Sequence, residues 1–293
     1  MDNVQTHSKL IGLPHLRYLN LDAREDRKTY MEEQFQQYGI TDYVRISADR
    51  YGPHNYDEWK NLLTVADYGK YIRKDNICYV SILVNQLQSI IDWYNSNQSE
   101  TCIILEDDLN MDTVKFWPFT WEYFFSKLPC NWDCVQLQVI GGSWIPMGLT
   151  NRSKNNHGAT AYLINRTYAE KLIKMHYIDG KFTFYNNYGY SKYWPEYHYQ
   201  SPDFVPYEIG VTYTFPLFIT NSTFGSDCYE GRVNMMAKKS DYAVVKWWKE
   251  ESSKYSLHDL LSTNTSRRKE LVIPISYTDQ DTRKEYGHSH SGE

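Results

Sequence analysis

The stretch at residues 101–110 constrains the fold more than any other part of the chain. An unbroken apolar series at 102–105 runs directly into three consecutive carboxylates, Glu106, Asp107 and Asp108. An apolar series without alternation is typical of a strand that is buried on both faces of a parallel sheet. Unpaired carboxylates cannot follow the strand into the core, because burying a bare charge is costly. We therefore expect the three acids at the carboxyl end of the strand, where open α/β sheets bind ligands.

Three adjacent acids repel one another unless a cation or a cationic partner lies between them. Mg²⁺ and Mn²⁺ bind the oxygens of carboxylates and phosphates, so a divalent ion that holds a substrate diphosphate would account for the acidic triplet. We predict that Glu106 and Asp108 bind this ion and that Asp227 or a histidine completes the ligand set. The alternative is an acidic loop whose side chains are hydrated.

Strand and helix patterns predict the α/β class, with a Rossmann-like, mostly parallel central sheet flanked by helices. Residues 15–21 and 43–47 form the first two strands, and the helix between them implies a crossover and a parallel pair. Residues 78–95 carry an apolar helical face, and 116–128 predict an aromatic helix.

The chain of 293 residues suits one large α/β domain. We predict that the domain spans residues 15–251, with a nucleotide-binding half at 15–110 and an acceptor half at 111–251. Residues 1–14 are expected to be loose. Residues 252–293 are expected to form a poorly packed polar tail, apart from one short strand.

Composition bears on the class of partner and on the compartment. The formal net charge of −5 argues against a general nucleic-acid binder, which normally has a basic face. Aromatic residues make up 16% of the chain and could fill a core or stack on sugars. Five cysteines without a paired framework suggest reduced thiols. With neither a signal peptide nor an apolar run of the ~20 residues that span a membrane, the expected location is cytoplasmic, or the host cytoplasm for a viral protein.

Polar residues after the first two predicted strands are candidates for nucleotide binding. Arg24 and Arg27 lie at a helix N-terminus, where backbone amides favour anions and guanidinium groups bind phosphate; alternatively they pair with neighbouring acids in a solvated turn. Asp49 could bind a ribose, or it could be a turn residue before Gly52.

Asp203 is the candidate general base that takes a proton from an attacking hydroxyl. Alternatively, it is an acid at the start of a helical turn.

Several segments resemble, in one order, motifs of glycosyltransferase family 25, the lipooligosaccharide and procollagen galactosyltransferase group. The acidic triplet is similar to the family's Glu-Asp-Asp metal motif. Ile82 stands where the family has a histidine after Ser81, and residues 182–200 have no clear counterpart. The segments that carry the resemblance are 18–27, 46–52, 78–81, 105–108, 132–137, 160–164, 169–172, 202–203 and 226–227.

The resemblance implies a GT-A fold and an inverting enzyme that moves a sugar from a nucleotide-sugar, usually a UDP-sugar, to a hydroxyl of a glycan or glycoconjugate. It implies dependence on Mn²⁺ (or Mg²⁺) and favours a bacterial or viral glycan enzyme. Aromatic residues at 182–194 would offer platforms for the acceptor sugar. The nucleotide pocket would be formed by Asn20, Asp22, Arg24, Arg27, Asp49, Ser81 and Asp107.

Two other functions fit the same residues. A carbohydrate-binding or scaffolding module could keep the fold without the chemistry, and a metal-dependent phosphoesterase could use the same acids. Dinucleotide, P-loop and serine-hydrolase functions lose their main support, because the sequence contains none of their glycine-rich motifs.

Overall fold

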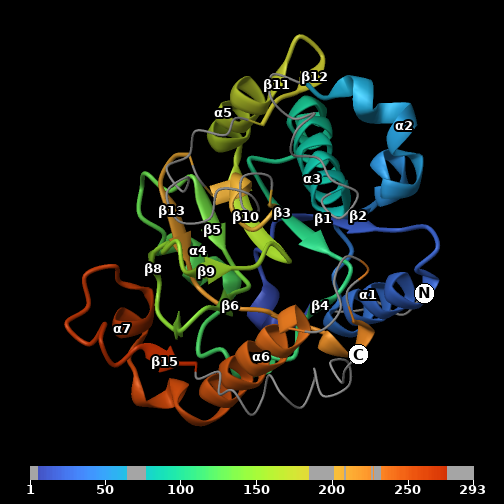
Figure 1. Ribbon diagram of the computed structural model, residues 1–293. Helices are drawn as coiled ribbons and strands as arrows, with labels where there is room; N and C mark the ends of the chain where they lie inside the picture. Colours follow the sequence, from blue (N-terminus) through green and yellow to red (C-terminus); the bar gives the residue numbers. More distant parts are fainter. Residues whose placement is uncertain are drawn as a thin grey trace, which may run out of the picture.

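The strand predicted from the apolar series is present as β3 (Thr101–Glu106), whose four central residues are buried. The computed structural model describes residues 6–64, 77–184, 201–207, 209–225, 227 and 232–275 (Figure 1). Within these residues β3 belongs to a seven-stranded sheet with the order β2-β1-β3-β10-β5-β13-β8. The other strands of this sheet are β1 (His15–Asn20), β2 (Tyr43–Ser47), β5 (Cys134–Gln136), β8 (Thr150–Asn151), β10 (Ala161–Asn165) and β13 (Thr212–Thr214).

The sheet is mostly parallel. β1 pairs in parallel with both β2 and β3, and β5 pairs in parallel with β13. β10 runs antiparallel to its neighbours β3 and β5, and β8 runs antiparallel to β13. Only these two strands of the described sheet are therefore reversed. The predicted mixed α/β class with a mostly parallel sheet is confirmed.

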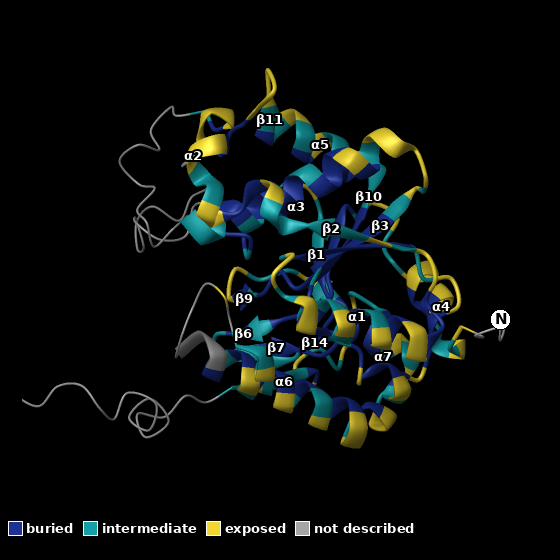
Figure 2. Cartoon of the chain, turned by 90° about the vertical axis from the view of Figure 1, so that its right-hand side faces the viewer, coloured by how far each residue is buried: buried dark blue, intermediate teal, exposed yellow. Residues whose placement is uncertain are grey.

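Two hydrophobic cores lie on the two faces of the sheet. Alternate residues of a strand point to opposite faces, so Ile103 and Leu105 enter one core while Cys102 and Ile104 enter the other. Helices α1 (Glu25–Tyr38) and α6 (Arg232–Glu250) pack on the first core. Helices α3 (Ile77–Ser96) and α5 (Arg166–His176) pack on the second, and Figure 2 shows the two pairs on opposite sides of the strands. The sheet is thus flanked by helices on both faces.

The remaining elements are short. Two-residue and three-residue strands form four small ladders, β4–β14, β6–β9, β7–β15 and β11–β12, outside the central sheet. Their bounds are β4 (Leu109–Asn110), β6 (Ile140–Gly141), β7 (Trp144–Pro146), β9 (Asn156–His157), β11 (Tyr177–Ile178), β12 (Lys181–Phe182), β14 (Ile219–Thr220) and β15 (Val272–Pro274). The short helices are α2 (Tyr56–Trp59), α4 (Trp121–Ser126) and α7 (Leu257–Leu261).

The aromatic helix predicted at residues 116–128 is shorter than expected. Trp117 is extended, with ψ of 133°, because the residue before a proline is pushed out of the helical region and Pro118 follows it. The helix begins only after Thr120, whose hydroxyl caps it by accepting a hydrogen bond from the backbone of Tyr123. The proline therefore splits the predicted helix.

Described residues near the N-terminus and within 252–275 pack more closely than the sequence predicted. Leu10, in the stretch expected to be loose, is 1% exposed and belongs to the first core. Leu260, Leu261 and Leu271 are also buried in that core, and β15 pairs with β7. The short strand predicted at residues 271–275 is present as β15, but the prediction of poor packing is wrong for the leucines at 260 and 261, and residues 276–293 lie outside the described residues.

No helix among the described residues has the length and apolar character needed to cross a lipid bilayer. Of the aromatic segment proposed as a sugar platform, residues 182–194, the part from 185 onward lies outside the described residues.

Candidate functional site

The acidic triplet lies where the parallel strands end. β1 ends at Asn20 and β3 ends at Glu106, and because they are parallel neighbours their carboxyl ends meet at the same edge of the sheet. A cavity of about 130 Å³ opens at this edge. Seven of the predicted site residues line it, namely Asn20, Arg27, Ser81, Glu106, Asp107, Asp108 and Asp227.

Asp107 is held on both of its carboxylate oxygens. Oδ1 accepts a hydrogen bond from the Arg27 guanidinium at 2.8 Å, and Oδ2 accepts one from the Asn20 amide at 2.7 Å. The side chains of Arg27 and Asp107 are only 7% and 9% exposed. Asp107 thus joins the start of α1 to the end of β3, and it positions Arg27 at the cavity.

Glu106 and Asp108 are crowded acids. Glu106 accepts a hydrogen bond from the Gln86 amide at 3.2 Å and one from the Thr160 hydroxyl at 3.4 Å. Burial raises the pKa of Glu106 well above its usual value, and the charges of Asp108, Asp203 and Asp107 raise it further. Burial, followed by the charge of Asp107, also raises the pKa of Asp108 to about 6. Among the described residues neither carboxylate forms an ion pair, although the charge of Arg27 opposes the rise in both pKa values.

The site offers two ligands for a divalent ion. Among the described residues, Oδ1 of Asp108 is buried and has no hydrogen-bond partner. An orphaned carboxylate oxygen beside a second desolvated carboxylate fits the hard oxygen ligands that Mg²⁺ and Mn²⁺ bind. Within the described ranges, however, no three His, Cys, Asp or Glu side chains form a group that could hold a metal ion. Substrate or water oxygens would be suitable further ligands.

The structure gives Asp227 different partners from those predicted. It lines the cavity, and its charge raises the pKa of Asp108. Its carboxylate nevertheless pairs with Arg24 at 2.5 Å and with Arg27 at 3.2 Å. Its side chain is 36% exposed. Asp227 is therefore a shared carboxylate partner of the two arginines that the sequence assigned to phosphate. Arg24 also pairs with its neighbour Asp26 at 2.9 Å, as the alternative interpretation of this turn predicted.

The other predicted nucleotide-binding residues form a network beside the cavity. Asp22 accepts hydrogen bonds from Arg45 at 2.5 Å and from Ser47 at 2.8 Å, and its backbone donates to Asp49 at 2.6 Å. Arg45 also donates to the Asn20 side chain at 2.8 Å. The sequence analysis missed Arg45, which lies within β2, where no motif distinguishes it.

Ser81 lines the cavity from the first turns of α3, but its hydroxyl donates to the Tyr51 carbonyl. Asn85, one turn further along α3, also lines the cavity and donates to the Ala48 carbonyl at 2.9 Å. These two side chains fix the segment that follows β2 against α3. In this structure they therefore shape the cavity wall.

Asp203 lies near the acidic triplet without lining the same cavity. Its Oδ1 accepts a hydrogen bond from the backbone of Gly158 at 3.0 Å, and its carbonyl accepts one from Arg152 at 2.7 Å. Its charge contributes to the raised pKa of Glu106. Asp203 is thus brought to the same edge of the sheet from a distant part of the chain, held by Gly158 and Arg152, which the sequence analysis did not single out.

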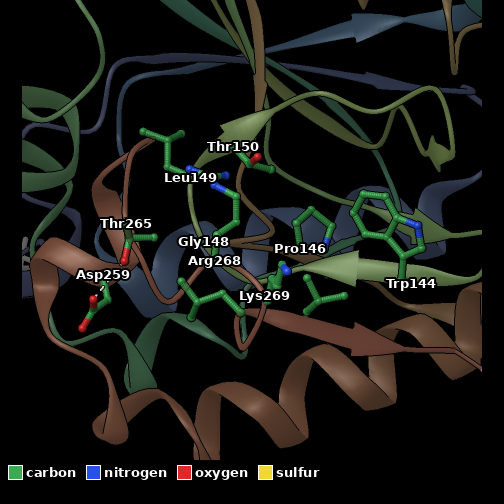
Figure 3. A pocket seen from close by; sticks show the side chains of 11 residues that line it. Trp144, Pro146, Gly148, Leu149, Thr150, Asp259, Thr265, Arg268 and Lys269 are labelled. Atoms are coloured by element: carbon green, nitrogen blue, oxygen red, sulfur yellow. Dashed lines mark hydrogen bonds between the residues drawn. The ribbon is translucent and has the colours of Figure 1, made fainter.

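A separate cavity of about 220 Å³ lies between β7, β8 and the C-terminal elements, and shares no lining residue with the first. Trp144, Pro146 and Leu149 form part of its mostly apolar wall (Figure 3). Two of its charged groups already have partners, since Asp259 belongs to the cap of α7 and Arg268 donates to the Thr263 carbonyl. This cavity therefore offers less chemistry than the sheet edge.

Comparisons with known proteins add little to this geometry. No protein-family model matches the sequence, and no functionally curated protein matches it. The solved structure of A197 from STIV is similar to the chain, with 11% sequence identity and a TM-score of 0.32 over 71% of this chain and 84% of that one. The site itself therefore carries the functional interpretation.

Proposed function

We propose that the chain is a metal-dependent glycosyltransferase that moves a sugar from a nucleotide-sugar, preferably a UDP-sugar, to a hydroxyl of a glycan or glycoconjugate. The proposal includes a GT-A type of α/β fold and inversion at the anomeric carbon, both of which the family 25 resemblance implies. One observation carries it: an orphaned Asp108 oxygen and a desolvated Glu106 share a cavity with the guanidinium of Arg27, at the carboxyl edge of the sheet.

That combination suits a diphosphate bound with a cation. Arg27 reaches the cavity at the start of α1, and guanidinium groups bind phosphate oxygens through parallel N–H groups. Glu106 and Asp108 would hold Mn²⁺ or Mg²⁺, which stabilises the negative charge that develops on a leaving diphosphate. Arg24 would join Arg27 once the donor phosphates replace Asp227, the one carboxylate that pairs with both guanidinium groups.

Asp203 is the proposed general base. In an inverting transfer, the acceptor oxygen forms a bond to the anomeric carbon as the bond between that carbon and the diphosphate oxygen breaks. The acceptor hydroxyl loses its proton to a carboxylate on the opposite side of the sugar from the leaving group. Asp203 lies at the same edge as Glu106, and the Gly158 backbone fixes one of its oxygens. Its other oxygen is the one that would accept the proton.

UDP binding measured by calorimetry with and without Mn²⁺ tests the donor site. The wild type should bind UDP in a Mn²⁺-dependent manner, and Asp108→Asn should abolish that dependence. Asp112→Asn is the matched control, because Asp112 is an exposed acid close in sequence that does not line the cavity. Hydrolysis of a panel of UDP-sugars by the same proteins tests turnover.

Two results would contradict the proposal. Unchanged Mn²⁺-dependent binding in Asp108→Asn would remove the metal role of the acidic triplet. If the wild type binds free sugars but does not bind UDP, the carbohydrate-binding module would be favoured instead.

A further inference from the structure

Gln138 is a buried amide without a partner at the sheet edge. It follows β5 by two residues and is 0% exposed, yet neither side-chain nitrogen nor oxygen has a hydrogen-bond partner among the described residues. Buried side-chain polar atoms in folded proteins are nearly always paired, so an amide with both atoms unpaired calls for an explanation.

The side-chain amide of the nearby Gln136, by contrast, is fully hydrogen-bonded. It is equally buried, and its nitrogen donates to the carbonyls of His157 and Gly158, both at 2.9 Å. Its oxygen accepts a hydrogen bond from the Thr214 hydroxyl at 3.1 Å. The fold can therefore supply hydrogen-bond partners for a buried glutamine at this edge. Gln136 has such partners and, among the described residues, Gln138 does not.

Other unpaired polar atoms lie in the same layer. Oδ1 of Asn156 and Nε of Arg152 are buried without partners within the described part of the chain. The two residues are neighbours, since the Arg152 guanidinium donates to the Asn156 carbonyl at 2.8 Å. Asn156 in turn donates from its amide to Thr214 at 3.4 Å, which links it to the Gln136 network. Unused donors and acceptors thus cluster next to one another.

The unpaired amide lies close to the proposed base. Gly158 has a φ of +106°, and a Cβ at that position would fall 2.3 Å from Oε1 of Gln138, so the amide lies directly against the Gly158 backbone. The N–H of the same glycine donates to Asp203. Gln138 is therefore separated from Asp203 by a single residue.

We propose that Gln138 is a contact residue of the acceptor subsite, with Asn156 and Arg152 beside it, and that the subsite takes a hydroxyl-rich ligand, a glycan or glycoside. This inference rests on the proposed function. Vicinal hydroxyls donate and accept at once, which matches an amide that offers both a donor and an acceptor. The Gln138 amide is covered in this structure, so the proposal requires a local rearrangement that uncovers it.

Gln138→Leu and Gln136→Leu, made separately, give the decisive comparison. Leucine at 138 removes an unpaired amide, so the melting temperature should rise by about 2 °C. Leucine at 136 removes three hydrogen bonds, those to the His157 and Gly158 carbonyls and the one from the Thr214 hydroxyl, and should lower the melting temperature. Saturation-transfer NMR with methyl glycosides of galactose, glucose and mannose, with and without UDP and Mn²⁺, should show about tenfold weaker binding in Gln138→Leu, the loss expected for two neutral hydrogen bonds.

Either of two results overturns the subsite. One is a fall in melting temperature for Gln138→Leu as large as that for Gln136→Leu, which would mark both amides as structural. The other is the lack of any Gln138-dependent glycoside signal under all conditions. The NMR samples without UDP test this subsite alone, and the calorimetry without glycosides tests the donor site alone. A failure of the donor site and a failure of this subsite therefore give different results.

Discussion

Arg27 and Asp107 form a buried ion pair, 2.8 Å apart, that joins the start of α1 to the end of β3. Arg27→Met should destabilise the protein by about 3–5 kcal/mol, because it leaves the Asp107 charge buried with only the Asn20 amide as a partner. Urea unfolding measures the change. Lys28→Met, at the next residue of the same helix, removes an exposed pair with Glu25 and should have no measurable effect. Equal stabilities for the two variants would contradict the structural role of the buried pair.

Asp227 competes with phosphate for Arg24 and Arg27. Asp227→Ala should therefore strengthen metal-free binding of inorganic pyrophosphate several-fold, because each guanidinium group loses one of its two carboxylate partners. Of the described carboxylate partners, Arg24 then keeps only Asp26, and Arg27 keeps only Asp107. Calorimetry measures the affinity. Glu25→Ala serves as a control, because it removes an exposed acid from α1, the helix that carries Arg27. If Asp227 were the third metal ligand, the variant would instead show weaker Mn²⁺-dependent UDP binding and no gain for pyrophosphate.

Asp241 makes the stability depend on pH. Burial raises its pKa from 3.8 to about 7, and the charge of Asp108 adds to the rise, while hydrogen bonds from Thr220 oppose it. Because the folded state favours the protonated acid, the stability that this group contributes is complete below pH 3.8 and is lost as the pH rises toward 7.

Asp241→Asn should remove this part of the pH dependence. An asparagine can still accept from the Thr220 backbone, and its amide can donate to the Thr220 hydroxyl. Melting temperatures of wild type and variant between about pH 4 and pH 8 should therefore diverge toward neutral pH, with the variant more stable there. Parallel curves would show that Asp241 titrates normally.

The C-terminal leucines belong to the main core. Leu260→Ala should cost about 2–5 kcal/mol, the range for a buried leucine that leaves a cavity. Leu62→Ala, at a leucine that is 38% exposed, is the same substitution at the surface and should cost much less. Similar denaturant midpoints for the two variants would show that residues 252–275 are only loosely attached to the core.

Sequence patterns predicted the position of the acids at the sheet edge, but not the side chains with which each acid pairs. The apolar series at 102–105 predicted β3, and the position of the acids followed from the cost of burying charge. The partners of each acid could not be predicted in the same way. Asp107 meets Arg27 and Asn20 only because α1 and β3 pack in one particular register, which no local pattern encodes.

Two other features were beyond the reach of local patterns. Gln136 and Gln138 lie on the same short stretch with similar neighbours, and only tertiary contacts show that one amide is paired and the other is not. The tail at 252–275 is polar overall and its elements are short, so the three leucines that anchor it did not form a recognisable period.

The anchoring of that tail also orders events during synthesis. The backbone amides of Met147 and Leu149 donate to the carbonyls of Leu271 and Leu260, at 2.9 and 2.8 Å, across more than a hundred residues of chain. During synthesis the β7–β8 region therefore cannot form these hydrogen bonds until residues 260 and 271 are available to it. Until then the nascent protein exposes an apolar flank, and chaperones that recognise such surfaces would have their best opportunity to bind it.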